Sequence, residues 1–201
     1  MVATVSHPAR RLLAGALLAA TSLMVAAPGA SATARHRRAG CANAHVQVTR
    51  STTARMQKAV VCLINRQRTE RGLPRLVANR RLDRSAQGWT HTMVSDAYFS
   101  HGAGTAFAAR ISAQGFDWAN VAENIATGYS TPAAVVTAWM HSPGHCANIL
   151  NPVYREVGTG VDRSAIRGSS TIRGTWTQDF GRLMGQPAPS TDFGPARACY
   201  R

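Results

Sequence analysis

The chain has 201 residues, of which 45% are hydrophobic and 16% are charged. This length and composition fit one globular domain with an extension, and they exclude a wholly disordered, collagen-like or many-helix membrane protein. Its 23 basic and 9 acidic residues give a formal net charge of +14. Only three acids are glutamates, so any catalytic glutamate must be Glu70, Glu123 or Glu156.

Residues 1–32 have the pattern of a secretory signal peptide. Arg10 and Arg11 precede an uncharged apolar run over residues 12–27, and small residues then offer cleavage sites after Ala32 or Ala34. A retained membrane anchor is the alternative, but a spanning helix needs about 20 apolar residues. We therefore expect a secreted, extracellular protein with no transmembrane segment after cleavage.

Export affects how the four cysteines are interpreted. An even number of cysteines in an oxidising compartment predicts two disulfides. A catalytic thiol at Cys146, next to His145, is the alternative, although neighbours on a helix do not usually face each other. We expect the pairs Cys41–Cys62 and Cys146–Cys199, which would pin a leader and a tail to the domain.

A basic leader over residues 33–51 is followed by a mainly helical stretch. Apolar residues at helical spacing predict a first helix that begins at Thr52 or Thr53 and ends before Gly72. Asn79 is a suitable N-cap for a second helix. A short third helix is expected near residues 107–111. The pairs Thr131-Pro132 and Ser142-Pro143 are start signals for two more helices.

The pattern changes to that of strands after residue 156. Residues 157–161 and 175–180 alternate with a period of two, which is typical of strands. A Pro-rich tail over residues 183–201 follows and contains Cys199. Helices first and antiparallel strands later predict an α+β domain with helices packed on a sheet.

Polar residues interrupt three apolar segments, 99–101, 122–126 and 142–150. His145 would lie in the first turn of a helix, whose positive end would lower the pKa of His145 and favour the neutral imidazole that a metal binds. Singly, His101 can be an ordinary loop histidine and Glu123 an ion-paired or capping carboxylate. None of the motifs of zinc proteases, serine hydrolases or nucleotide-binding loops occurs.

In their order along the chain these segments resemble the CAP superfamily (SCP domains of cysteine-rich secretory, antigen 5 and pathogenesis-related proteins), in particular its bacterial branch. The resemblance covers about residues 52–182 and rests on five blocks: His101, 123–126, 139–150, 156–160 and 176–180. It implies an α-β-α sandwich, with a central antiparallel sheet between helical layers and a large cleft.

The resemblance also implies a site. His101 and His145 match the histidines that bind zinc or another divalent cation in the family, and Glu123 is the candidate catalytic residue. Ser142 stands where many eukaryotic members have a second glutamate, which reduces the site to three residues. The cleft is expected to contain four polar side chains, those of Glu123, Asn124, Ser142 and Gln178.

Two functions follow as expectations. The first is an extracellular or cell-envelope binding module that takes a lipid, sterol or anionic envelope ligand and binds a divalent metal weakly. The second is a zinc-dependent, peptidase-like hydrolase that acts on an extracellular or envelope substrate. Specific nucleic-acid binding is not expected, because the basic residues are scattered rather than grouped with aromatic ones. We expect a monomer.

Overall fold

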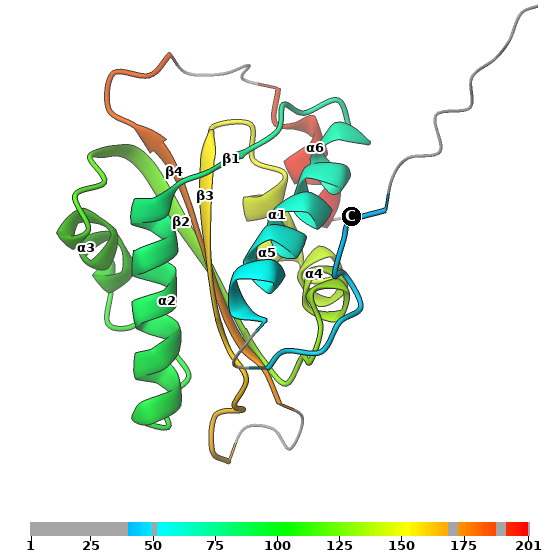
Figure 1. Cartoon of the computed structure of the whole chain (residues 1–201). Helices are drawn as coiled ribbons and strands as arrows, with labels where there is room; N and C mark the ends of the chain where they lie inside the picture. The colour runs from blue at the N-terminus through cyan, green and yellow to red at the C-terminus, as the bar shows by residue number, and fades with distance from the viewer. Residues whose placement is uncertain (1–39, 50–51, 169–172, 188–191, 201) are drawn as a thin grey trace, which may run out of the picture. The chain divides into compact units, whose positions relative to one another are not determined.

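The computed structural model describes residues 40–49, 52–168, 173–187 and 192–200 (Figure 1). The expected signal peptide, residues 1–32, and leader residues 33–39 lie outside this part of the chain. The elements, in chain order, are α1 (Thr53–Thr69), β1 (Val77–Ala78), α2 (Arg80–Ser95), α3 (Ala106–Ala113), β2 (Trp118–Thr127), α4 (Pro132–Met140), α5 (Pro143–Ile149), β3 (Glu156–Asp162), β4 (Thr175–Leu183), α6 (Gly194–Arg197) and the 3₁₀ turn η1 (Ala198–Tyr200).

The four strands form one sheet in the order β1-β3-β4-β2. Strands β2, β4 and β3 are antiparallel neighbours, whereas the short β1 runs parallel to β3. Helices α2 and α3 lie on one side of the sheet, and α1, α4, α5 and α6 lie on the other (Figure 1). The expected α-β-α sandwich is therefore confirmed, with a mixed sheet in place of the fully antiparallel one.

Two glycines allow α2 to lie directly on β3. A Cβ atom at Gly158 would come within 2.1 Å of the Leu82 carbonyl carbon, and one at Gly160 within 2.3 Å of the Ala86 carbonyl oxygen. The helix backbone thus occupies the space that side chains at these strand positions would need. This close approach brings side chains from the same helix to the edge of the strand.

Side chains close the edge of β3 beyond its short pairing with β1. The Thr159 N–H donates to Asp83 Oδ1, and the Val161 N–H donates to Gln87 Oε1. The Thr159 carbonyl accepts from Gln57 on α1, and the Val161 carbonyl accepts from Gln87. The backbone groups that an incoming strand would use are therefore already paired.

Arg68, at the end of α1, is a fully buried guanidinium. Its Nε donates to the Pro74 carbonyl, and its Nη1 donates to the carbonyls of Ile149 and Asn151, all at 2.8 Å. Pro74 lies in the loop after α1, Ile149 is the last residue of α5, and Asn151 follows it, so one side chain links the loop after α1 to the end of α5. Charged donors make each of these hydrogen bonds stronger than a neutral one.

Two disulfides tie the ends of the described chain to the helical layer. Cys41 is bonded to Cys62 on α1, and Cys146 on α5 is bonded to Cys199 in η1. These are the two pairs that we expected, and the described residues contain no free cysteine. The thiol alternative at Cys146 is therefore wrong.

Tyr154 should make the fold sensitive to alkali. Burial raises its pKa to about 12, and its ring stacks on Phe180 with centroids 5.6 Å apart. Its contribution to stability is complete below pH 10, where the unfolded phenol is still protonated, and disappears as the pH rises to 12. Relative to Tyr154→Phe, the wild type should lose about 2–3 kcal/mol of unfolding free energy over that interval.

Denaturant unfolding at pH 8, 10 and 11.5 measures this loss. Tyr200→Phe is the matched control, because Tyr200 is 67% exposed. Parallel pH profiles for the wild type and Tyr154→Phe would contradict the assignment.

Candidate metal and ligand site

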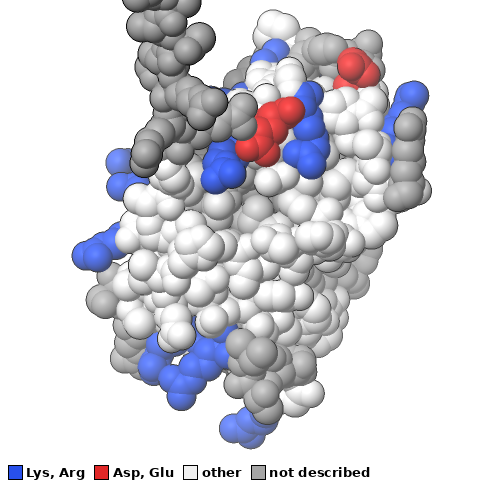
Figure 2. All heavy atoms as spheres, turned by 90° about the vertical axis from the view of Figure 1, so that its right-hand side faces the viewer, with Lys and Arg blue, Asp and Glu red and all other residues white. Residues whose placement is uncertain are grey.

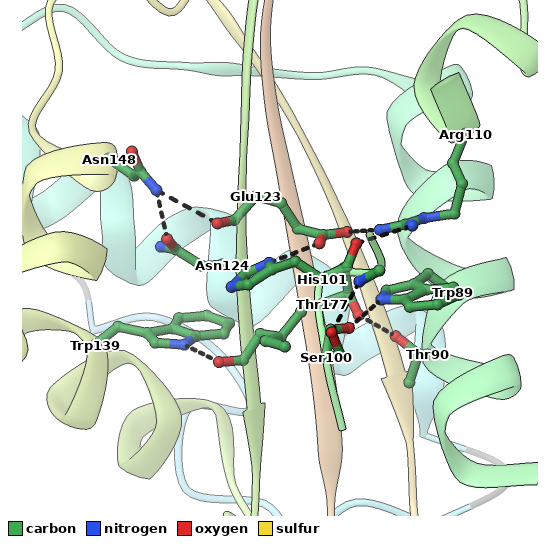
Figure 3. A network of polar contacts seen from close by, with 12 residues as sticks. Trp89, Thr90, Ser100, His101, Arg110, Glu123, Asn124, Trp139, Asn148 and Thr177 are labelled. Atoms are coloured by element: carbon green, nitrogen blue, oxygen red, sulfur yellow. Dashed lines mark hydrogen bonds and ion pairs between the residues drawn. The ribbon is translucent and has the colours of Figure 1, made fainter. Parts of the chain in front are cut away.

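Glu123, in the middle of β2, is the centre of a buried polar network (Figure 3). His101, in the loop between α2 and α3, has its Nδ1 2.8 Å from Glu123 Oε1, and Arg110 Nη2 donates to Glu123 Oε2 at 2.8 Å. The Glu123 side chain is 1% exposed, whereas that of His101 is 45% exposed. The strand thus holds a carboxylate inside the protein, and the carboxylate holds a histidine at the surface.

The loop that carries His101 is fixed by α2 and α3. The Arg110 guanidinium lies 3.7 Å from the centre of the Trp89 ring and donates to the His101 carbonyl. Trp89 Nε1 in turn donates to the Ser100 carbonyl. A cation stacked on an aromatic ring and bonded to both the loop and Glu123 is a rigid support for His101 (Figure 3).

His145 lies at the start of α5 and is oriented by its own N-cap residue. Ser142 makes no side-chain hydrogen bond to the helix backbone, and its Oγ lies 2.9 Å from His145 Nδ1 instead. Burial, followed by the charge of His101, lowers the pKa of His145. The direction agrees with the sequence argument, and the causes are burial and the second histidine.

An amide cluster holds α5 against β2. Asn148 Nδ2 donates to Asn124 Oδ1 at 2.9 Å, and Asn124 Nδ2 donates to the His145 carbonyl at 3.2 Å and faces Gln178 Oε1 at 3.4 Å. Asn124 and Gln178 are completely buried. These amides therefore hold the helix that carries His145 against the sheet, and those of Asn124 and Gln178 do not meet solvent.

A cavity of about 680 Å³ opens beside the two histidines. Its wall includes His101, His145 and Ser142 together with the aromatic residues Phe99, Tyr129 and Trp139. Of the four expected cleft residues only Ser142 lines it.

The other three, Glu123, Asn124 and Gln178, are not among the residues that line this cavity. They belong to the two central strands β2 and β4, and the loop with His101 and helix α5 cover them. No carboxylate lines the cavity among the described residues.

The donor set fits a metal only loosely. Glu123 and Ser142 occupy the Nδ1 atoms of His101 and His145, which leaves the two Nε2 atoms for a ligand. A carboxylate on the far nitrogen of an imidazole is the usual outer partner of a metal-binding histidine. The described residues contain no group of three histidine, cysteine or acidic side chains that could hold a metal ion. The possible metal ligands at this site are therefore the two imidazoles, and Glu123 is the outer partner of His101.

Sequence reasoning missed three supporting residues, Arg110, Trp89 and Asn148. Asn148 lies within the block 142–150, at the spacing from His145 that places both on neighbouring parts of one helical turn. Arg110 and Trp89 gave no local signal, because their partners are 13 and 11 residues away in the chain.

The fold and the paired histidines define a class of protein. Residues 61–180 match the Cysteine-rich secretory protein family, CAP, and the chain belongs to this family. YkwD of Bacillus subtilis is 35% identical over 133 residues, which are 65% of this chain and 48% of that protein. The membrane protein YlbC of the same organism is 32% identical over 109 residues, 53% of this chain and 32% of that protein.

Solved structures agree with this assignment. An extracellular protein from Bacillus anthracis that contains an SCP domain superposes with a TM-score of 0.56 at 25% identity, over 67% of this chain and 44% of that one. An outer surface protein from Borrelia burgdorferi, at 20% identity and a TM-score of 0.55, shares the fold over 63% of this chain and 91% of its own. In the two relatives from Bacillus subtilis, YkwD and YlbC, the matched region covers about half or less of the length of the protein.

In the part of the chain that the structure describes, no helix is both long and apolar enough to cross a bilayer. The two disulfides are consistent with an oxidising, extracellular environment.

Proposed function

We propose that the protein is a secreted binding module of the bacterial cell envelope, whose cavity holds zinc or another divalent cation weakly between His101 and His145. The observation that carries the proposal is the pair of imidazoles at one cavity, each with its Nδ1 already engaged. A bound metal would supply a Lewis acid at the cavity wall. His101 and His145 would hold it through Nε2, and Glu123 would keep His101 in the required tautomer.

The position of Glu123 favours binding over hydrolysis. A general base must reach the water that it activates. Glu123 is buried, accepts hydrogen bonds from His101 and Arg110, and does not line the cavity. The zinc-dependent hydrolase therefore lacks a placed base among the described residues.

The walls and the surface indicate the kind of ligand. Phe99, Tyr129 and Trp139 give the cavity an apolar, aromatic lining that suits a lipid or sterol. On the face drawn in Figure 2, basic side chains surround a broad uncharged area rather than forming one patch. Such a distribution suits loose attraction to anionic envelope polymers and does not resemble a nucleic-acid groove.

Zinc titration by calorimetry at neutral pH tests the metal proposal. We expect one weak site per wild-type chain, and no binding by His101→Ala or His145→Ala. Glu123→Gln should weaken zinc binding about tenfold, because outer-shell partners typically contribute that much.

His141→Ala is the matched control, since His141 is exposed and its ring Nδ1 lies 2.8 Å from the Thr137 carbonyl of α4. Equal zinc binding by the wild type and His101→Ala, or no binding by either, would overturn the site. Separately, turnover of a peptide or envelope substrate that Glu123→Gln abolishes in a folded protein would favour the hydrolase. A binding module should keep its ligand affinity in that variant.

A further inference from the structure

A second acid lies behind Glu123. Asp179, on β4, is the cross-strand partner of Glu123 on β2, and it is completely buried. Cross-strand partners lie on the same face of a sheet, about 5 Å apart, so the two carboxyl groups share one pocket. Like charges in such a position destabilise the pair unless something neutralises one of them.

The pocket holds too few cations for two carboxylates. The groups that act on Asp179 are Glu123 from β2, Ser85 from α2 and Arg110 from α3. The β3 residue opposite it is Gly158, which has no side chain. The Arg110 guanidinium bonds to Glu123, so with the neutral His101 that the site requires, one positive charge faces two acids.

The hydrogen bonds indicate which acid is ionised. Both oxygens of Glu123 accept, one from His101 and one from Arg110, as a carboxylate does. No well-formed hydrogen bond reaches either oxygen of Asp179 or the buried Ser85 Oγ, although Ser85 and Glu123 are the side chains placed to bond to Asp179. Burial, and then the charge of Glu123, raise the pKa of Asp179 well above its usual value.

We propose that Asp179 is a neutral carboxylic acid that donates its proton toward Glu123 and so positions that carboxylate for His101. The acid O–H faces a carboxylate with free lone pairs, and its C=O faces the Ser85 hydroxyl, so one proton gives Ser85 and both oxygens of Asp179 partners. Glu123 remains the one anion, balanced by Arg110. Asp179 is thus a positioning residue, two side chains away from the cavity.

This inference deepens the proposed site, because a fixed Glu123 keeps the His101 proton on Nδ1 and turns the Nε2 lone pair toward the cavity. It can fail independently of metal binding, since the acid can be observed in the metal-free chain. Conversely, a neutral Asp179 would stand even if zinc did not bind.

Infrared spectroscopy of the full, metal-free chain at neutral pH tests the neutral acid. We expect a C=O stretching band of a protonated carboxylic acid that shifts on ¹³C-aspartate labelling and not on ¹³C-glutamate labelling. The band should be lost in Asp179→Asn and kept in the control Asp96→Asn, because Asp96 is an exposed acid at the end of α2. The labelled wild type needs no substitution, so the presence of a protonated aspartate can be tested even if the variant fails to fold.

The tautomer of His101, read from its ¹⁵N shifts, tests the positioning role. Asp179→Asn still offers an N–H donor and should leave the Nδ1–H form dominant, whereas Asp179→Ala should redistribute the proton between the two nitrogens. Absence of the acid band, or a band that shifts with glutamate labelling, would overturn the neutral acid. Identical His101 tautomers in both variants would overturn the positioning role.

Discussion

Arg68→Ala should be among the most destabilising single substitutions in the described part of this domain. The guanidinium is fully buried and supplies three hydrogen bonds, to carbonyls in the loop after α1 and at the end of α5. Hydrogen bonds from charged groups contribute about 1.5–3 kcal/mol each, so we expect a loss of about 4 kcal/mol or more of unfolding free energy. Guanidinium chloride unfolding with both disulfides intact measures it.

The neighbouring Arg66→Ala is the matched control for this prediction. Arg66 has a half-exposed side chain that pairs with Glu70 at 3.6 Å on the surface of the same helix. An exposed pair of this kind contributes at most about 1 kcal/mol. Equal losses in the two variants would show that the buried hydrogen bonds of Arg68 are not what stabilises these two segments.

The second large effect is expected at the contact between α2 and β3. In Gly158→Ala the new methyl group would meet the backbone of Leu82 and Asp83 at 2.1 and 2.2 Å. Backbone cannot rotate away as a side chain can, so α2 must lift from the sheet, and we expect a loss of about 3 kcal/mol or more. Thermal and denaturant unfolding both report it.

Gly88→Ala tests whether the effect comes from the contact or merely from adding a methyl group. Gly88 lies on the exposed side of α2, and a Cβ atom added there would have no neighbour within 4 Å. Alanine in a helix is favoured over glycine by about 1 kcal/mol, so this variant should be slightly more stable than the wild type. A tolerated Gly158→Ala would contradict the close packing of helix on strand.

The helices could be predicted because their signals are local. Asn79 and Thr131 accept hydrogen bonds from the N–H groups of Arg81 and Ala134, as N-caps should. Ser142 shows the limit of such rules. It begins a helix as predicted, yet its hydroxyl serves His145 and not the helix backbone.

Strand β2 could not be predicted in the same way. Residues 122–126 are all buried and show no alternation between buried and exposed positions, because helices cover the sheet on both sides. The sequence therefore marked Glu123 and Asn124 as a polar motif without showing that they point to opposite faces. Neither residue is in the lining of the cavity beside the histidines.

The tertiary part of the site had no sequence signal at all. Arg110 meets Glu123 only because α3 packs against β2, and Asp179 meets it only through the strand register. Pairing of this kind depends on the whole fold rather than on spacing along the chain. The family resemblance supplied the two histidines with their partners Glu123 and Ser142, but not Arg110 and Asp179 behind them.

The closed edge of β3 has a consequence for how this sheet can vary. Asp83 and Gln87 accept hydrogen bonds from the N–H groups of Thr159 and Val161, as the carbonyls of a further strand would otherwise do. Two polar positions on α2 therefore belong, functionally, to the sheet. Replacing them with apolar residues would leave backbone N–H groups at the edge of β3 unpaired and open to another strand. The position of α2 along β3 therefore helps to keep a further strand from joining the sheet at this edge.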